Sequence, residues 1–385
     1  VQECASGVTH HIRCQYLVSC EGGQSRIRRA MGAQLEGREC ISKFCTTYLR
    51  SNELRVRWPH APGWMHRIYN ADGESHVIAI DGTDLWLHHS ILGPDGDLDA
   101  HDHRPAIRHA LGADLDYEVL GQERWIARAL VADRYHNERV FLCGDSAHIW
   151  IPMGGFGMNA GIEDAINLSW KLSATLAGWA TPALLDSYEA ERRSIGQLVA
   201  GSAAKIFEDL YRIPVQDPLF EAEGPAADAL RAEIGRSITQ HNVAEFDSIG
   251  MQLGVTYGAS PIICYDGGTL PPFAINQYTE SSCPGARAPH FWRTSGRALY
   301  DDLGRGFTLL RIGADAPDAA SLRAVFARRN VPLEVLDIEE AIAPTKYQHY
   351  PLVLVRPDQH IAWRSMTAPE NPMAIVDIVI AAARD

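Results

Sequence analysis

The residues best suited to chemistry lie in a glycine-rich loop that follows a short, strongly apolar run. The apolar run covers residues 139–143, and Gly144 and Asp145 come directly after it. Four further glycines are Gly154, Gly155, Gly157 and Gly161. Backbone without Cβ atoms can approach a flat ligand, and the N–H groups at a helix start favour negative charge. The spacing therefore predicts a site for a flat, anionic ring, with a plain strand-loop-helix connection as the alternative.

A second stretch, from about residue 46 to residue 91, carries alternating polar and aromatic side chains. Its candidates for contact with a bound molecule lie around Trp64 and Trp86, and they are His66, Arg67, Tyr69, His88 and His89. A histidine near its usual pKa of about 6.5 can act as a base toward a phenol. Because successive strand residues point to opposite faces, half of these side chains are expected to face solvent.

Strands and one short helix must position these residues. Residues 9–18 are predicted to form a strand, and residues 26–31 a short helix. Short apolar runs divided by turns predict an antiparallel sheet over residues 46–91. Residues 104–111 have helical spacing, and residues 139–143 are typical of a strand that is buried on both faces.

Two helices are expected after the glycine-rich loop. The first starts at Met158, and its apolar face is expected to include Ile162 and Ile166. Thr181 is expected to cap the second helix, which runs to about Tyr211. The charged residues of the second helix are expected to form a solvated face: Glu189, Glu191, Arg192 and Arg193.

The last hundred residues are predicted to form a separate small domain. Linkers rich in proline and glycine precede it, at residues 214–218 and 271–285. Its elements are expected in the order strand, helix, strand, strand, helix, at residues 307–312, 319–329, 332–336, 352–358 and 374–383. This order suggests an α/β sandwich that resembles thioredoxin. No cysteine follows Cys283, which excludes thiol redox chemistry for this domain.

Composition narrows the class of partner. The 385 residues include 35 Lys and Arg against 48 Asp and Glu, so the net charge of −13 disfavours phosphate backbones and anionic lipids. No apolar stretch reaches the roughly 18–20 residues that cross a bilayer. The eight cysteines are scattered without zinc-type spacing, so we expect no metal, reduced thiols and a cytoplasmic location. The expected partner is a small molecule, with no nucleic acid and no membrane.

Residues 139–172 resemble the second FAD-binding motif of the single-component flavoprotein aromatic hydroxylases, the family of p-hydroxybenzoate hydroxylase and phenol hydroxylase. That motif is a buried strand, Gly-Asp, an Ala-His pair, a proline, and then glycines before a helix. The resemblance implies that Asp145 bonds the ribityl chain of FAD and that Pro152 lines the reaction face. The implied cofactor residues in this segment are Gly144, Asp145, Pro152, Gly154, Gly155, Gly157, Met158 and Asn159.

Residues 16–29 resemble the Asp-Gly motif of the same family, which touches both FAD and the nicotinamide cofactor. Glu21 stands where the family has Asp, so the charge is kept and one methylene is added. The resemblance implies cofactor contacts for Glu21, Gly22 and Arg28. A plain turn is the alternative interpretation of Glu21 and Gly22.

Four residues are candidates for catalysis under this resemblance. Pro152 lines the expected reaction face, and Trp150 lies beside it on the loop, where core packing is the alternative role. His66 and His88 are the candidates to deprotonate a phenol.

A third resemblance covers the tail of the chain. Residues 355–364, entered through residues 284–289, are similar to the C-terminal domain of the phenol hydroxylase branch and of polyketide hydroxylases. In that branch the domain is structural and supports dimer contacts, which implies a homodimer.

The expected fold class is therefore α/β and α+β. It comprises a partial FAD-binding α/β domain with an inserted antiparallel substrate-binding sheet, plus a C-terminal thioredoxin-like α/β domain. The expected boundaries are 1–36 and 133–213 for the FAD-binding domain, 37–132 for the substrate-binding sheet, 214–284 for a helical linker region and 285–385 for the thioredoxin-like domain.

The predicted function is FAD-dependent hydroxylation of a phenolic or other aromatic substrate. NADPH or NADH and O₂ would be consumed through a C4a-hydroperoxyflavin, as the resemblance implies. No G-x-G-x-x-G unit for the ADP half of FAD precedes Glu21, so we expect an N-terminally truncated member of the family. The alternatives are a catalytically inactive fragment or dimerisation module, and another flavoprotein of the superfamily such as an epoxidase or halogenase.

Overall fold

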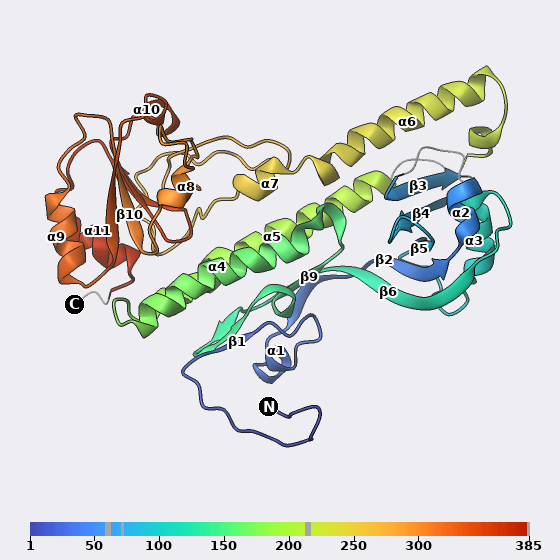
Figure 1. The fold of residues 1–385 in the computed structure, drawn as a ribbon, viewed down its shortest axis with the longest axis horizontal. Helices are drawn as coiled ribbons and strands as arrows, with labels where there is room; N and C mark the ends of the chain where they lie inside the picture. The colour runs from blue at the N-terminus through green and yellow to red at the C-terminus, as the bar shows by residue number, and fades with distance from the viewer. Residues whose placement is uncertain (58–62, 71–72, 212–216, 383–385) are drawn as a thin grey trace.

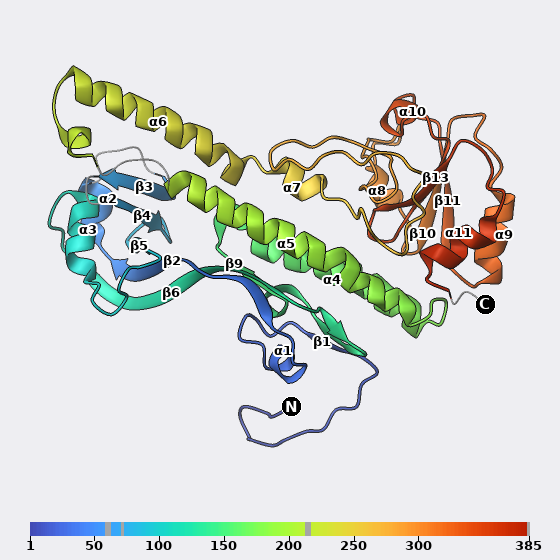
Figure 2. The ribbon, with the colours of Figure 1, turned by 180° about the vertical axis from the view of Figure 1, so that it is seen from behind.

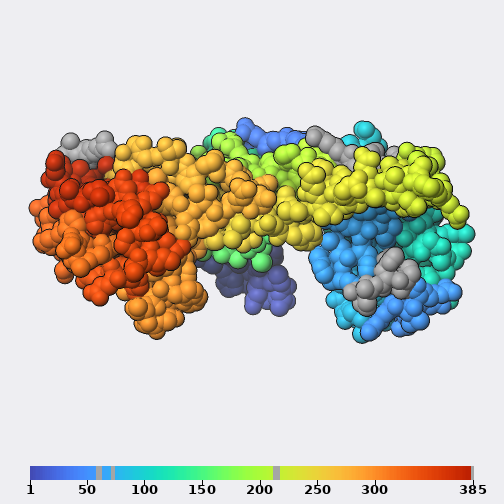
Figure 3. Space-filling model, turned by 90° about the horizontal axis from the view of Figure 1, so that it is seen from above, coloured from blue at the N-terminus to red at the C-terminus, as the bar shows by residue number. Residues whose placement is uncertain are grey.

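The molecule is elongated, with a six-stranded sheet at one end and a C-terminal α/β domain at the other (Figure 1). The computed structural model describes residues 1–57, 63–70, 73–211 and 217–382. Two long helices, α4 (Phe156–Leu176) and α5 (Ala183–Tyr211), run side by side between the two ends. The view from above shows the same separation of the two ends (Figure 3).

A three-stranded sheet joins the two predicted cofactor motifs. Its order is β1 (Leu17–Ser19), β8 (Val140–Leu142) and β7 (His136–Asn137). β1 runs parallel to β8, and helix α1 (Arg26–Ala30) follows it as predicted. The strand predicted for residues 9–18 is mostly wrong, because β1 pairs only along the three residues of β8.

The six-stranded sheet confirms the predicted antiparallel region and extends it. Its strands, in spatial order, are β3 (Met65–Asn70), β4 (Gly73–Ala79), β5 (Leu85–Gly93), β2 (Leu35–Arg50), β6 (Glu118–Ala132) and β9 (His148–Trp150). Helices α2 (Asn52–Arg57) and α3 (His103–Leu111) cover one face, where Trp86, Val77 and Ile107 share a core. The last strand, β9, belongs to the glycine-rich loop, so the loop is attached to this sheet.

The pair of long helices buries charge and exposes apolar side chains, the reverse of what the sequence predicts. Ile162 and Ile166 on α4 are about half exposed, whereas Asp164 on α4 and Glu191 and Arg192 on α5 are buried. The charged residues pair with one another across the helix interface, and this pairing makes their burial tolerable. The prediction that Glu191 and Arg192 lie on a solvated face is therefore wrong.

The start of α5 differs in detail from the prediction. The helix begins at Ala183, after Pro182, close to the predicted position. The Thr181 hydroxyl donates to the carbonyl of Ala381 at 2.8 Å, and among the described residues no N–H of the first turn donates to the hydroxyl oxygen. Thr181 therefore fastens the C-terminal domain to the helix pair.

The region from residue 217 to residue 284 contains helices as well as irregular chain. A short 3₁₀ turn, η3 (Pro218–Glu221), precedes α6 (Pro225–Phe246) and α7 (Ile249–Leu253). α6 begins near the six-stranded sheet and runs back alongside α5 toward α7 (Figure 2). It thereby closes one side of the space between the sheet and α5.

The C-terminal domain has one four-stranded sheet, in the order β11-β10-β12-β13. The strands are β10 (Phe307–Ile312), β11 (Leu333–Ile338), β12 (Leu352–Val355) and β13 (Ile361–Ser365), and the helices are α8 (Leu299–Asp302), α9 (Ala320–Arg328), α10 (Ala343–Lys346) and α11 (Pro372–Val379). β12 ends earlier than predicted, because Pro357 and the positive φ of Gln359 turn the chain into β13, which the sequence reasoning missed. The likeness to thioredoxin stays a prediction.

Candidate functional site

The glycine-rich loop starts where the buried strand β8 ends. Gly144 adopts a φ of +59°, and its N–H donates to Asp164 at 3.1 Å. Asp145 follows in a 3₁₀ turn, η1 (Gly144–Ser146), and is exposed. Within the described part of the chain, the Asp145 carboxylate has no hydrogen-bond or ion-pair partner. The Asp145 carboxylate can therefore accept bonds from a ligand, and its bond to FAD stays a prediction.

The second half of the loop ends at an uncapped helix. Gly154 and Gly155 have φ values of +70° and +65°, in the 3₁₀ turn η2 (Met153–Gly155). A Cβ on Gly154 would lie 2.3 Å from the ring of Phe156, so no larger residue fits there without rearrangement. No side chain caps α4, and Met158 and Asn159 in its first turn are exposed. The helix start can therefore meet an anionic group.

Trp150 brings an unused donor to the same place. Its ring stacks on His148 at 4.3 Å, and its indole Nε1 is buried without a hydrogen-bond partner among the described residues. That nitrogen lies 3.8 Å from where a Cβ on Gly157 would stand. A buried N–H without a partner is costly unless a ligand satisfies it.

The Glu21 turn lies against the glycine-rich loop, and Arg28 connects the two. Arg28 is buried and donates to the Ser146 carbonyl at 3.0 Å and to the Gly23 carbonyl at 2.8 Å. Glu21 itself accepts from the Ile27 N–H at 2.6 Å and the Ser25 hydroxyl at 2.7 Å, and these bonds lower its pKa. Glu21 is thus occupied at the start of α1, while Gly22, with a φ of +83°, forms the turn.

A cavity of about 210 Å³ lies between the six-stranded sheet, the glycine-rich loop and the helices α5 and α6. The loop contributes Pro152 with its two neighbours, and the sheet contributes Trp125 and the exposed Trp64. Phe44 stacks on Trp125 at 4.1 Å with nearly parallel rings. Its aromatic, largely apolar wall suits a flat aromatic molecule.

The polar residues of this cavity form one row across the sheet. Arg67 pairs with His76, His76 with His89 and His89 with Thr46 on four neighbouring strands. Burial, together with the nearby His76, lowers the pKa of His89 to about 4. The Arg67 guanidinium forms an ion pair with Glu245 and a 2.5 Å hydrogen bond with Asn242, both on α6. The cavity thus has one polar strip in an apolar wall.

Two of the predicted catalytic histidines lie elsewhere. His66 and His88 alternate with the cavity-facing residues of their strands and are not among the residues that line the cavity. His88 is almost fully buried on the face that α3 covers, and burial lowers its pKa to about 3. Because successive side chains of residues 85–93 point to opposite faces of the sheet, the sequence predicts that His88 and His89 lie on different faces. The position of the glycine-rich loop then shows which of the two faces meets a ligand.

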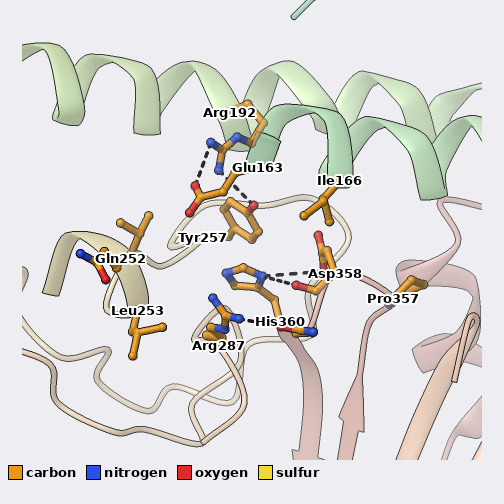
Figure 4. Close-up of a pocket in the computed structure, with 12 residues that line it drawn as sticks. Glu163, Ile166, Arg192, Gln252, Leu253, Tyr257, Arg287, Pro357, Asp358 and His360 are labelled. Atoms are coloured by element: carbon orange, nitrogen blue, oxygen red, sulfur yellow. Dashed lines mark hydrogen bonds and ion pairs between the residues drawn. The ribbon is translucent and has the colours of Figure 1, made fainter. Parts of the chain in front are cut away.

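A second cavity, of about 230 Å³, lies between the helix pair and the C-terminal domain (Figure 4). Arg192 points from α5 toward Glu163 and Tyr257, at 3.1 and 3.4 Å. His360 lies beside Asp358 on the opposite wall. Its polar side chains are bonded to one another, which is typical of a structural junction.

The described ranges contain neither a metal-binding cluster nor a membrane-spanning helix. No group of three or more His, Cys, Asp or Glu side chains there has an arrangement that holds a metal ion. No helix in the same ranges combines the length and apolar character of a membrane span.

Comparison with known proteins assigns the family. Residues 1–203 match the FAD binding domain family, and residues 281–380 match the aromatic-ring hydroxylase C-terminal family. The chain therefore belongs to the FAD-dependent aromatic-ring hydroxylases.

Individual relatives agree with this assignment. The chain is 30% identical to the FAD-dependent monooxygenase opdD of Penicillium oxalicum, over 91% of this chain and 71% of that protein. It is 32% identical to a putative polyketide hydroxylase of Streptomyces halstedii, over 94% of this chain and 66% of that protein.

Two experimental structures share the fold. The rebeccamycin biosynthetic enzyme RebC with reduced flavin superposes with a TM-score of 0.83 at 34% identity, over 96% of this chain and 68% of that one. Aklavinone-11 hydroxylase with FAD and aklavinone gives 0.75 at 26% identity, over 95% and 68%. The family assignment and the fold class expected from the sequence are thereby confirmed.

Proposed function

We propose that this chain holds the flavin ring of FAD against the glycine-rich loop and hydroxylates an aromatic substrate in the cavity beside Pro152. One observation carries the proposal. The loop that is suited to a flat anionic ring also forms a wall of the aromatic cavity, through Pro152 and its neighbours. A flavin and a substrate can therefore lie next to each other.

The residues present fit FAD at this loop. Asp145 offers the ribityl hydroxyls a carboxylate that has no partner among the described residues. Within the same ranges, Trp150 offers an unpaired N–H and the start of α4 its uncapped N–H groups. When bound and reduced by NADH or NADPH, FAD supplies the activated oxygen for the aromatic ring.

The side chains of this chain bind and orient the substrate. Phe44 and Trp125 offer a stacked aromatic surface, and the row of Arg67, His76 and His89 offers hydrogen bonds. The relatives include polyketide and aklavinone hydroxylases, so the proposed substrates are phenols of one or several fused rings.

Flavin retention followed by coupled turnover tests the proposal. The purified chain is mixed with FAD, desalted and examined for the visible flavin band, and then supplied with NADH or NADPH and a panel of phenols. Retained flavin and a product with one added oxygen atom are expected. Retained flavin with no phenol-dependent NADH or NADPH oxidation contradicts the hydroxylase assignment, and loss of flavin contradicts the cofactor site.

Two further parts of this proposal concern the surroundings of the protein. We propose a homodimer, supported by the resemblance of the C-terminal domain. Light scattering measures the molar mass of the protein in solution.

We also propose a cytoplasmic location, supported by eight cysteines that are all free of disulfides in the described ranges. A monomer over all measured concentrations, or disulfides in protein isolated with blocked thiols, contradicts these parts.

A further inference from the structure

We propose that His76 and His89 act as a matched acceptor and donor that selects aromatic substrates with a hydroxyl group next to a carbonyl group. The inference rests on the proposed function for the location of the substrate. It concerns two histidines on neighbouring strands, whose ring centroids are 6.4 Å apart. The hydrogen-bond partners of each ring determine whether the nitrogen that faces the cavity carries a proton.

The tautomer of His89 follows from a chain of two hydrogen bonds. The indole N–H of Trp125 can only donate, and it donates to the Thr46 oxygen at 3.0 Å. Among the described residues, the one acceptor in reach of the Thr46 hydroxyl proton is Nδ1 of His89, at 2.7 Å. With Nδ1 accepting, the ring proton is on Nε2. His89 therefore presents a donor to the cavity.

The tautomer of His76 is opposite. Its Nε2 lies 2.9 Å from the Glu74 carboxylate, which can only accept when ionised. Nε2 therefore carries the proton, and Nδ1 of the neutral ring is an acceptor. The hydrogen bonds within the described ranges use Nε2 of His76 and Nδ1 of His89 and leave the second nitrogen of each ring open. Water or a bound ligand can therefore bond both nitrogens.

A hydroxyl and a carbonyl on adjacent carbons, or on facing positions of fused rings, match this pair. The His89 N–H donates to the carbonyl oxygen, and His76 Nδ1 accepts from the hydroxyl group. Apart from the row of Arg67, His76 and His89, most of the cavity wall consists of aromatic and aliphatic side chains. The two histidine nitrogens therefore fix the orientation of the substrate ring.

The same arrangement provides a base. The phenol O–H bond breaks, its proton forms a bond with Nδ1 of His76, and the electron pair stays on the phenolate oxygen. The imidazolium that results is held by the Glu74 carboxylate at Nε2. A phenolate is more electron-rich than a phenol and is the better acceptor of an electrophilic oxygen atom.

The charged and titratable groups around His76 come from three strands and one helix. They are Glu74 on its own strand, Arg67 on β3, His89 on β5 and Glu245 on α6. Arg67 is already paired with Glu245, so Glu74 is the carboxylate that acts directly on His76. His89 stays neutral near neutral pH, because burial lowers its pKa to about 4.

Binding of small isomers tests the pair without turnover. The probes are salicylaldehyde, with adjacent groups, and 4-hydroxybenzaldehyde, with separated groups, each titrated into the flavin-loaded chain and followed by absorbance. We expect salicylaldehyde to bind about tenfold more tightly than 4-hydroxybenzaldehyde, because one additional good hydrogen bond contributes about that factor. Bound salicylaldehyde is also expected to show the red-shifted absorbance band of a phenolate. Equal binding of the two isomers, or binding of neither, overturns the pair, whether or not the chain hydroxylates other phenols.

Conservative variants separate the two roles. His89→Gln keeps an N–H donor and is expected to keep the preference, which His89→Ala loses. His76→Asn keeps an acceptor but no base, so the probe binds without the phenolate band.

Thr46→Val removes the bond that fixes the His89 tautomer and is expected to reduce the preference severalfold, with Thr46→Ser restoring it. His103→Gln, on the helix that covers the opposite face, is the matched control and keeps the preference. A preference that survives His89→Ala, or a phenolate band that survives His76→Asn, overturns the assignment of these roles.

Discussion

The molecule buries polar side chains in two regions that are organised differently. Between the helix pair and the C-terminal domain, Arg356 bonds both Glu191 and Asp358, and Lys171 also bonds Glu191 at 2.6 Å. Around the aromatic cavity, the buried indole N–H of Trp150 has no partner among the described residues, and the hydrogen bonds there leave one nitrogen of His76 and one of His89 open. The first region satisfies itself and holds two parts of the chain together. The second is incomplete without a ligand.

The charge network is also coupled to the glycine-rich loop. Asn167 bonds Glu191, Tyr257 and Asp358, and Tyr257 lies 3.4 Å from Arg192. Arg192 in turn holds Asp164, whose carboxylate bonds the loop at Gly144 and His148. Burial alone would raise the pKa of Asp164, but Arg192 and His148 lower it below its usual value. The network therefore supports the loop from behind, while the loop's front surface stays open.

Removing Arg356 is expected to have the largest effect on stability. Arg356→Met removes the guanidinium that two buried carboxylates share and leaves Lys171 as the one cation bonded to Glu191 among the described residues, which costs about 3–5 kcal/mol of unfolding free energy. Urea denaturation measures it. Arg329→Met, which breaks a partly exposed ion pair with Asp377 in the same domain, is the control and is expected to cost below about 1 kcal/mol. Equal losses for the two variants would show that the buried network is no more important than a surface pair.

Acidification is expected to act through His88. Burial lowers its pKa to about 3 in the folded protein, so the unfolded chain binds the proton first as pH falls below its usual pKa of about 6.5. Unfolding free energy is therefore highest above that value and falls as pH drops toward the folded pKa.

A variant without the imidazole measures the share of that pH effect that belongs to His88, because the cavity-facing His89, with a pKa of about 4, contributes a loss of its own. Between about pH 7 and pH 4, His88 contributes a loss on the order of 2–3 kcal/mol, at about 1.4 kcal/mol per pKa unit. Urea titrations at the two pH values should show that His88→Gln removes this part of the loss, with the exposed His10→Gln as control. An unchanged slope in His88→Gln contradicts the account. His88 Nε2 is also buried without a partner among the described residues, yet His88 does not line the cavity, so an unpaired atom alone does not mark a ligand site.

Trp150→Phe tests the incomplete region directly. The change keeps the ring stacked on His148 and deletes an N–H that has no partner in the described ranges. FAD affinity is expected to fall by about tenfold, while unfolding free energy without FAD stays the same or rises slightly. Flavin fluorescence titration and urea denaturation measure the two quantities. A stability loss with unchanged FAD affinity would place Trp150 among the packing residues.

Glu21 is expected to show the smallest effect. Glu21→Ala removes the acceptor of the Ile27 N–H at the start of α1, which lowers the unfolding free energy slightly. FAD affinity should change little, because the carboxylate is already used within the protein. A large loss of FAD affinity with unchanged stability would instead show that Glu21 contacts the cofactor, as the resemblance implies.

Local sequence signals predicted the elements that depend on short-range physics. The apolar run before Gly144, the glycines around residue 155 and Pro182 at the start of α5 each placed an element within a few residues. The alternation of residues 85–93 predicted a strand with two faces.

Long-range contacts account for what the sequence did not reveal. In the sequence, Glu191 and Arg192 are typical of a solvated helix face. In the structure, Arg356 pairs with Glu191 and Asp164 pairs with Arg192, and both pairs are buried. Similarly, the sequence does not distinguish His89 from His88 as a ligand contact. The chain after the edge strand β9 lines the same cavity as His89, and this long-range arrangement distinguishes them. Glu245 on α6 enters the cavity from far along the chain, and no local pattern marks it.

The central claim is that the loop that holds the flavin also forms a wall of the substrate cavity. The most direct measurement is the visible absorbance spectrum of the flavin-loaded chain during anaerobic titration with salicylaldehyde. The account predicts a saturable change in the flavin band that accompanies binding of the probe, because the two rings lie side by side. Binding of the probe with an unchanged flavin band would contradict the claim.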